Sequence, residues 1–197
     1  MKLLVYLLEE LQMFLPGSYS FYDLPGDWQV RPVPMCHLKR THPGLHMSAL
    51  LQELCQVERF TKGQEEALQL LTSLERIRFW SCDKLQRLPA GLHRLPNLKR
   101  LDITNCAAIR SLPKDGLPSS LQELEIRFCP AIRSIPKECL PNSLQKLAIR
   151  RCPAIRSLPK ADDLPSSLRE LDVHYSENEE LRRQCRKLIG TIPIVIA

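Results

Sequence analysis

The chain has 197 residues, of which 44% are hydrophobic and 25% charged, and its formal net charge is +6. This length allows one domain, or one domain with an appendage, and the composition is that of an ordinary soluble globular protein. No apolar run approaches the roughly 20 residues that a membrane-spanning helix requires, which excludes an integral membrane protein built on such helices.

Residues 1–50 are expected to form a poorly defined N-terminal segment. The leucines between Leu4 and Leu15 fall at helical spacing before Pro16-Gly17, which predicts a short amphipathic helix. A secretory signal is the alternative, but Glu9-Glu10 interrupts the apolar run and no clear cleavage site follows. Scattered prolines and the lack of periodicity then predict a loop up to residue 50.

One group of side chains near this loop could in principle bind zinc: Cys36, His37, His42, His46 and Cys55. His42 and His46 share helical spacing, but Pro43-Gly44 between them disfavours a helix, and the segment contains no C-x-x-C pair. We expect incidental residues in an irregular segment, and hence no metal and no cofactor.

The main pattern of the chain is a repeat of 23 or 24 residues between Leu71 and Tyr175. Four units end in Cys and a fifth ends in Ser, and they occupy residues 74–82, 98–106, 121–129, 144–152 and 168–176. Each unit follows L-x-x-L-x-L-x-x-N/C, the pattern and period of a leucine-rich repeat. The predicted fold class is therefore an α/β solenoid over residues 51–175, with a parallel concave sheet and an irregular, Pro-rich convex side.

Alternation within each unit predicts a strand with one buried and one outward face, as at Leu101 and Ile103 around Asp102. The Cys that closes a unit is expected to turn into the core as a buried thiol. Stacked thiols would repeat about 4.8 Å apart, too far for a disulfide, and a line of them is no tetrahedral zinc site. Reduced thiols suit a cytoplasmic location.

Residues 176–197 are expected to form a C-terminal cap helix and a tail. Ser176 and Glu179 have the capping-box form, and the pattern up to Gly190 predicts a helix over 177–189 that covers the last strand. A short apolar tail, 192–197, follows. A further short helix is predicted over Glu65–Leu71, ahead of the first complete repeat.

From about Val57 the chain resembles the C-terminal leucine-rich repeats of plant nucleotide-binding disease-resistance proteins, particularly those of grasses. The resemblance rests on the motifs Val57-Glu-Arg-Phe60 and Gln64–Leu71, the Ala-Ile-Arg-Ser-Leu/Ile-Pro-Lys copies, the Leu-Pro-Ser/Asn-Ser-Leu linkers, and Glu180–Pro193. It implies a non-catalytic, protein-binding role in innate immunity, either pathogen recognition or restraint of a nucleotide switch. The implied partners are a pathogen effector, a host guardee or a nucleotide-binding module.

The chain departs from that family because no phosphate-binding glycine loop of the form G-x-x-x-x-G-K-[ST] is present. A truncated, non-signalling scaffold or decoy that binds proteins is therefore the alternative. An extracellular receptor-type repeat is a third hypothesis, which the missing L-x-G-x-I-P signature disfavours.

The candidate partner-binding surface consists of outward-facing strand residues and their neighbours on the concave face. Exposed aromatic and Arg side chains on a rigid sheet have the character of interface hot spots, although a solvated sheet face with mixed charge is the alternative. The residues are Arg76, Arg78, Trp80, Arg100, Asp102, Glu123, Glu125, Arg127, Phe128, Lys146, Arg150, Arg151, Asp172, His174 and Tyr175.

A second basic set occupies matching positions on the convex side: Arg110, Arg133 and Arg156, with Lys114, Lys137 and Lys160. An acidic protein partner and a merely solvated, duplicated edge are both compatible with it. The sequence contains no recognised nucleic-acid motif, so nucleic-acid binding is not predicted. It also contains no recognisable Ser/His/Asp order, H-E-x-x-H sequence or convergent carboxylate pair, so enzymatic activity is not predicted.

Overall fold

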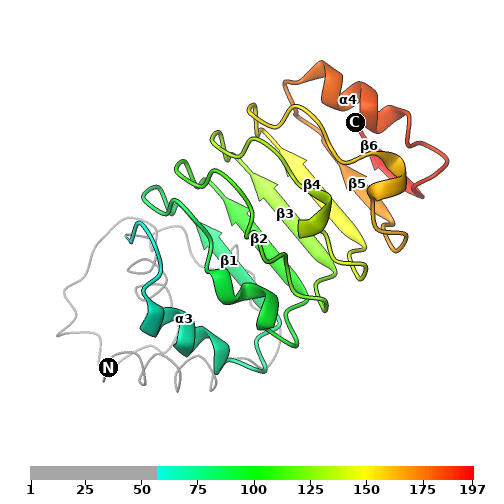
Figure 1. The fold of residues 1–197 in the computed structure, drawn as a ribbon. Coiled ribbons are helices and arrows are strands. Elements are labelled where there is room, and N and C mark those ends of the chain that lie inside the picture. Colours follow the sequence, from blue (N-terminus) through cyan, green and yellow to red (C-terminus); the bar gives the residue numbers. More distant parts are fainter. Residues whose placement is uncertain (1–56) are drawn as a thin grey trace, which may run out of the picture.

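The computed structural model describes residues 57–197, and these residues build one open sheet of six parallel strands in chain order. Figure 1 shows the strands side by side, each followed by a return segment on the same side of the sheet. The strands are β1 (Arg76–Trp80), β2 (Arg100–Thr104), β3 (Glu123–Arg127), β4 (Lys146–Arg150), β5 (Glu170–Asp172) and β6 (Ile194–Ile196).

Equivalent positions of successive repeats pair directly across this sheet. Leu101 pairs with Leu124 and Leu124 with Leu147, while Ile103, Ile126 and Ile149 form a parallel row one pleat away. The repeat period therefore sets the strand register, and the predicted stack of leucine-rich repeats is confirmed over the described residues.

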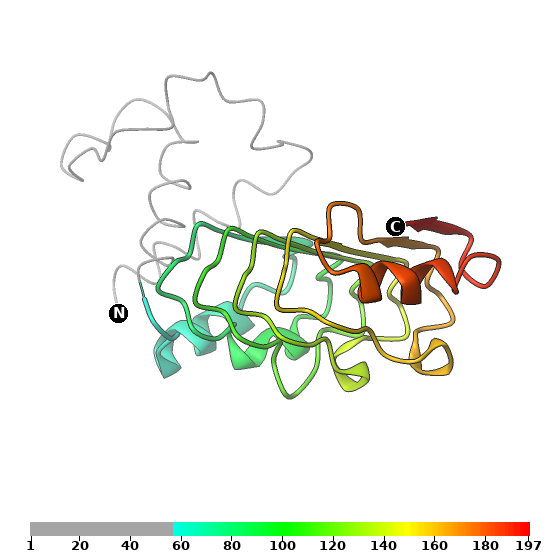
Figure 2. The ribbon, with the colours of Figure 1, turned by 90° about the horizontal axis from the view of Figure 1, so that it is seen from above.

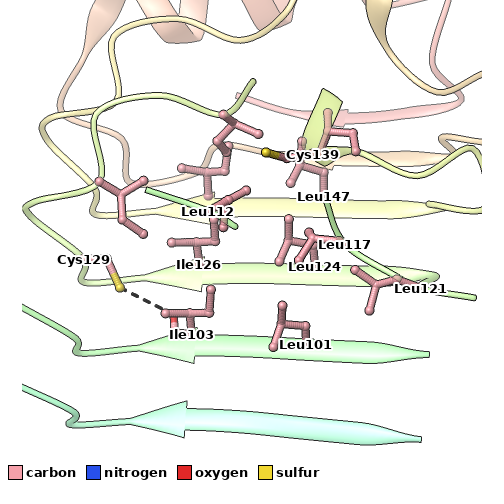
Figure 3. Packing of buried hydrophobic residues seen from close by; sticks show 14 of the residues in the cluster. Leu101, Ile103, Leu112, Leu117, Leu121, Leu124, Ile126, Cys129, Cys139 and Leu147 are labelled. Atoms are coloured by element: carbon pink, nitrogen blue, oxygen red, sulfur yellow. Dashed lines mark hydrogen bonds between the residues drawn. The ribbon is translucent and has the colours of Figure 1, made fainter. Parts of the chain in front are cut away.

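The core lies between the sheet and the return segments, where apolar residues from both sides meet (Figure 3). Leu101, Ile103, Leu124 and Ile126 are completely buried, and Leu112 packs over them from a return. Each strand alone has only one narrow apolar face, so its burial depends on its neighbours, as in other repeat proteins.

The ladder cysteines stabilise the turn at the end of each strand as well as filling the core. The thiols of Cys106, Cys129 and Cys152 donate to carbonyls two residues earlier, at S–O distances of 3.4, 3.1 and 3.3 Å. Figure 3 marks a second bond, from Cys129 back to the Ile103 carbonyl on the preceding strand. These three thiols are free and buried as predicted, but Cys82 is disulfide-bonded, which contradicts the expectation of four reduced ladder thiols.

Polar side chains of the linkers join the repeats at the other end of the strands. The Ser120 hydroxyl donates to the Leu98 carbonyl at 2.9 Å, Ser143 to Leu121 at 2.6 Å and Ser167 to Leu144 at 2.6 Å. The Leu-Pro-Ser/Asn-Ser-Leu motif thus has a structural role, because it satisfies one carbonyl of the preceding repeat.

The return side, expected to be irregular, contains three short 3-10 helices: η4 (Ala90–Arg94), η5 (Lys137–Cys139) and η6 (Ala161–Asp163). Pro89 and Pro136 immediately precede η4 and η5, and the fixed φ of proline suits the residue before a helical turn. Figure 2 shows these returns on the side opposite the strands.

The helix predicted over Glu65–Leu71 is present as α3 (Lys62–Gln69), shifted toward the N-terminus. The shift follows from a capping box that the sequence analysis did not use. The Thr61 hydroxyl accepts from the Gln64 backbone N–H at 3.3 Å, and the Gln64 side chain accepts from the Thr61 N–H at 2.9 Å.

The helix predicted over 177–189 is present as α4 (Glu179–Arg186), which is shorter at both ends. Its N-cap is Asn178, whose side chain accepts hydrogen bonds from the Glu180 and Leu181 N–H groups. The prediction of a capping box formed by Ser176 and Glu179 was therefore wrong. Ser176 instead accepts from the Asn178 N–H. α4 leads to β6, which pairs with β5; the expected tail is thus a strand of the sheet.

The predictions for residues 1–50, and the zinc-ligand group from Cys36 to Cys55, lie outside the described residues. Within residues 57–197, none of the helices is long and apolar enough to cross a membrane.

We predict that Ile126→Ala lowers the free energy of unfolding by about 2–5 kcal/mol, because it leaves a cavity between two neighbouring strands. Urea unfolding followed by circular dichroism measures the change. Gln122→Ala, at an exposed position near the start of the same strand, is the control and should change the free energy by less than about 0.5 kcal/mol. Equal effects of the two substitutions would contradict the stacked core.

Stability is predicted to fall in alkaline solution partly through Cys185, because burial raises the pKa of this thiol to about 11. The unfolded thiol ionises near its ordinary value of 9.0, so this contribution is complete below pH 9 and is lost as the pH rises from 9 to 11. Urea midpoints at pH 8, 9, 10 and 11 should therefore decline more steeply for the wild type than for Cys185→Ala. Parallel curves would argue against a buried, protonated thiol.

Candidate functional site

The outward-facing strand residues form columns across the sheet, and we call this surface the open face. One column runs from Arg76 through Arg100, Glu123 and Lys146 to Glu170, as the register predicts. A second contains Arg78, Asp102, Glu125, Ala148 and Asp172, and a third contains Trp80, Thr104, Arg127 and Arg150. β6 extends the first two columns with Ile194 and Ile196, both exposed, which the sequence analysis missed.

The charges of these columns neutralise one another. Arg100 meets Glu123 at 2.5 Å and Lys146 meets Glu170 at 2.7 Å, in each case on the adjacent strand. Glu125 lies between Arg127 and Arg150, and Asp102 lies near Arg76 and Arg78, at 3.9 and 3.5 Å. Each basic side chain of the columns therefore has a carboxylate neighbour, and the mixed charge is mainly used within the sheet.

Asp172 is buried rather than presented to a partner, with 1% of its surface exposed. Its Oδ2 accepts a hydrogen bond from Arg150 Nε at 2.9 Å, and its Oδ1 accepts from the backbone N–H of His174 at 2.8 Å. The carboxylate thus fixes both Arg150 and the turn that leads to Tyr175.

Asp102 lies in the same column, but its carboxylate is less well satisfied by hydrogen bonds. It is 7% exposed, and its buried Oδ2 has no hydrogen-bond partner within the described structure. Burial raises the pKa of this carboxyl above its ordinary value, against the opposing effect of the Arg78 charge. Because the Asp102 carboxyl is buried, it is better placed to influence its own strand than to bind a partner.

Directly after the strands, five residues adopt a left-handed backbone, and we call this set the rim: Ser81, Asn105, Phe128, Arg151 and Tyr175, with φ between 51° and 62°. Glycine is the usual residue in this conformation, which costs other residues about 1–2 kcal/mol. The conformation turns the following Cys or Ser into the core, and in Asn105 and Phe128 the N–H still bonds the next strand. The left-handed backbone thus explains the turn into the core, but it does not explain the bulky side chains of Phe128, Arg151 and Tyr175.

The second half of the rim is a stack of rings around one guanidinium. The Arg151 Cζ lies 5.3 Å from the centroid of Phe128 and 5.3 Å from that of Tyr175. The His174 ring meets the Tyr175 ring in an edge-to-face contact, at a centroid distance of 3.8 Å. The rings remain open to solvent, since Phe128 is 45% and Tyr175 60% exposed. The sequence placed these residues together but gave no sign of their stacking.

The first half of the rim is polar and smaller. The Asn105 side-chain amide donates to the Ser81 hydroxyl at 3.0 Å. Trp80, beside Ser81, is 43% exposed. Aromatic surface is therefore present at both ends of the open face.

The basic residues of the return side keep matching positions in successive repeats. Arg110, Arg133 and Arg156 are exposed, and within residues 57–197 none of them has an ion pair. Lys137 differs, because it meets Asp163 of the next repeat at 2.9 Å. The expected ladder of like charges is thus partly relieved by an acidic neighbour.

Among the described residues, no cluster of His, Cys, Asp or Glu side chains has the arrangement of a metal site. The carboxylates of the open face are paired with Arg and Lys side chains. The arrangement is suited to surface recognition.

Comparison with known proteins gives little further information. No protein-family model matches the chain, and no curated protein matches it. Among solved structures, it is similar to the leucine-rich repeat domain of the type III effector XCV3220 (XopL), with 17% identity and a TM-score of 0.32, over 81% of this chain and 85% of that one. A likeness at this level carries no information about function.

Asp102 and Asp172 form a matched pair for a stability test, and the two Asp→Asn substitutions should have opposite effects. Because the folded-state pKa of Asp102 is raised, protonated Asp102 contributes to folding stability below pH 3.8. This contribution is lost as the pH rises through the folded-state pKa. At pH 7, Asp102→Asn should therefore leave stability unchanged or raise it by up to about 1 kcal/mol. Asp172→Asn weakens the contact with Arg150 and should lower stability by about 1–3 kcal/mol.

Thermal unfolding at pH 4 and pH 7 distinguishes the two. The advantage of Asp102→Asn should be larger at pH 7 than at pH 4, because the raised pKa of Asp102 makes the folded wild type lose stability as the pH rises above 3.8. A loss from Asp102→Asn as large as that from Asp172→Asn would show that the two carboxylates have equivalent roles.

Proposed function

We propose that this chain is a protein-binding repeat module that recognises its partner through the rim and the neighbouring open face. The observation that supports this most directly is the solvent exposure of Phe128 and Tyr175 beyond the C-terminal ends of β3 and β5. Large rings and arginines in such positions are typical of interface hot spots, because they bury much apolar area at low entropic cost.

The proposal narrows the set of predicted contact residues. Asp102 and Asp172 are buried, and Arg100, Glu123, Glu125, Arg127, Lys146 and Arg150 are ion-paired within the sheet. If these side chains bound a partner, their existing ion pairs within the sheet would have to break. Exchanging one exposed ion pair for another gives little net affinity. Arg76 and Arg78 are likewise paired, with Asp102. Phe128, Arg151, His174 and Tyr175 remain as direct contacts, with Trp80 at the other end.

Within protein binding, the motifs from Val57 to Pro193 favour a role in plant innate immunity, as the recognition part of a receptor of the nucleotide-binding class. The partner would be a pathogen effector, a host guardee or a nucleotide-binding module. The alternative is a non-signalling scaffold or decoy, which the lack of a phosphate-binding glycine loop in this sequence favours. The free thiols of Cys106, Cys129, Cys139, Cys152 and Cys185 agree with a cytoplasmic location, whereas the disulfide-bonded Cys82 does not.

The binding surface can be tested by affinity capture from grass leaf extract with three forms of the chain. Proteins retained by the wild type should be lost with Phe128→Ala/Tyr175→Ala, because the exposed rings are removed. They should be retained by Arg110→Ala/Arg133→Ala/Arg156→Ala, which alters the return side only. The captured protein is then purified and its Kd measured against all three forms.

An increase in Kd of about tenfold or more for the double variant, with the triple variant unchanged, is the expected result. The reverse pattern would place the interface on the return side, and equal binding by all three would overturn the rim. Capture of a nucleotide-binding module or a pathogen protein favours the immune-receptor role over the scaffold.

A further inference from the structure

Among the residues that the structure describes, Arg151 has no acidic partner, unlike the Arg and Lys residues of the open-face columns. Within residues 57–197 it makes neither an ion pair nor a hydrogen bond through its side chain, whereas its sequence neighbour Arg150 meets both Glu125 and Asp172. Its contacts are instead the two rings of Phe128 and Tyr175. We call these three residues the clamp.

The clamp restricts the guanidinium without using its donors. A guanidinium donates only in its own plane, so contacts with aromatic faces leave its N–H groups available. Rings on two sides also remove much of the rotamer freedom that an exposed Arg would otherwise lose on binding. Tyr175 contacts the His174 ring, and the backbone N–H of His174 donates to the Asp172 carboxylate. The arrangement is therefore pre-organised from the buried end of β5 outward.

The backbone adds an independent observation. Phe128, Arg151 and Tyr175 all have the left-handed conformation that glycine adopts without strain, and the turn needs no side chain there. Bulky residues in this conformation are outliers, and such outliers concentrate at functional sites. The side chains of the clamp are thus better explained by what they contact than by the fold.

We propose that the clamp binds a carboxylate, supplied by an Asp or Glu side chain of the protein partner. A single planar guanidinium offers two parallel donors, which match the two oxygens of a carboxylate. A phosphate group would call for further cations or backbone donors, and the nearest cation in sequence, Arg150, is already paired. The flanking rings would exclude water from the contact and strengthen it. This inference rests on the proposed protein-binding function and specifies the chemistry of one contact.

Arginine side-chain NMR of the full chain tests this contact without any knowledge of the partner. The chain is labelled with ¹⁵N-arginine, and the Nε–Hε signal of Arg151 is assigned by its absence in Arg151→Lys. Potassium acetate, potassium methyl phosphate and potassium chloride are then titrated at constant ionic strength. Arg127 and Arg150, which already hold carboxylates, serve as internal controls in the same spectra.

The expected result is a saturable shift of the Arg151 signal with acetate, while Arg127 and Arg150 do not shift. Phe128→Ala and Tyr175→Ala should each weaken the acetate affinity by roughly two- to fivefold, because each removes one cation–π contact. A non-saturating Arg151 shift, an equal shift with chloride, or saturation by methyl phosphate alone would overturn the proposal.

A second measurement separates this proposal from the broader one. If acetate fails to bind but Phe128→Ala/Tyr175→Ala still abolishes protein capture, the clamp is not a carboxylate site and the rim remains the interface. If acetate binds as expected but capture is unaffected by the rim variants, the carboxylate site stands as a property of the chain and the proposed interface is wrong.

Discussion

In-register pairing of parallel strands is the constraint on which the rest of this structure depends. Because β2, β3 and β4 begin 23 residues apart and pair residue for residue, each side chain lies beside its counterpart in the next repeat. The same rule buries the row through Ile103, Ile126 and Ile149, and it aligns Phe128, Arg151 and Tyr175 along the rim. The core and the candidate site thus both follow from one spacing: alternation along the strands buries the isoleucine row, and the left-handed turn after the strands exposes the rim.

Stacking also imposes an electrostatic problem that the chain solves differently on its two sides. On the open face, oppositely charged residues follow one another, as with Arg100 and Glu123, so adjacent strands attract. On the return side, Arg110, Arg133 and Arg156 repeat one charge, and within residues 57–197 Lys137 is the one member of this basic set that meets a carboxylate. The open face is electrostatically satisfied before any partner arrives. The proposed function therefore assigns recognition to the aromatic rings and Arg151 at the strand ends.

Much of the fold could be predicted from the sequence because its signals are local and repeated. The alternation around Asp102, Glu125 and Ala148 identified the strands, and the constant period identified their register. The end of the chain was harder. Ser176 and Asn178 are both good N-cap residues, and only the position of the turn determines which one caps α4. β6 was missed because a three-residue strand next to Pro193 has no alternation long enough to recognise.

The candidate site was predictable as a set of residues but not as an arrangement. Asp102 and Asp172 have equivalent places in the repeat, yet Asp102 Oδ2 has no hydrogen-bond partner among the described residues, whereas Asp172 accepts hydrogen bonds from Arg150 and His174. That difference depends on contacts between strands, which no single repeat contains. The stacking of Arg151 likewise depends on rings located 23 residues before it and 24 residues after it in the chain.

The serine hydroxyls of the linkers have a consequence for how such a chain can change its length. Ser120, Ser143 and Ser167 each bond a carbonyl of the repeat immediately before, and never one farther away. Excision of residues 121–143 would join Ser120 to Leu144 and keep the serine-to-carbonyl contact between neighbouring repeats, although it would remove Phe128 and place Arg100 beside Lys146. The array is in this sense modular: genetic gain or loss of one unit alters the reach of the molecule while its joints stay the same.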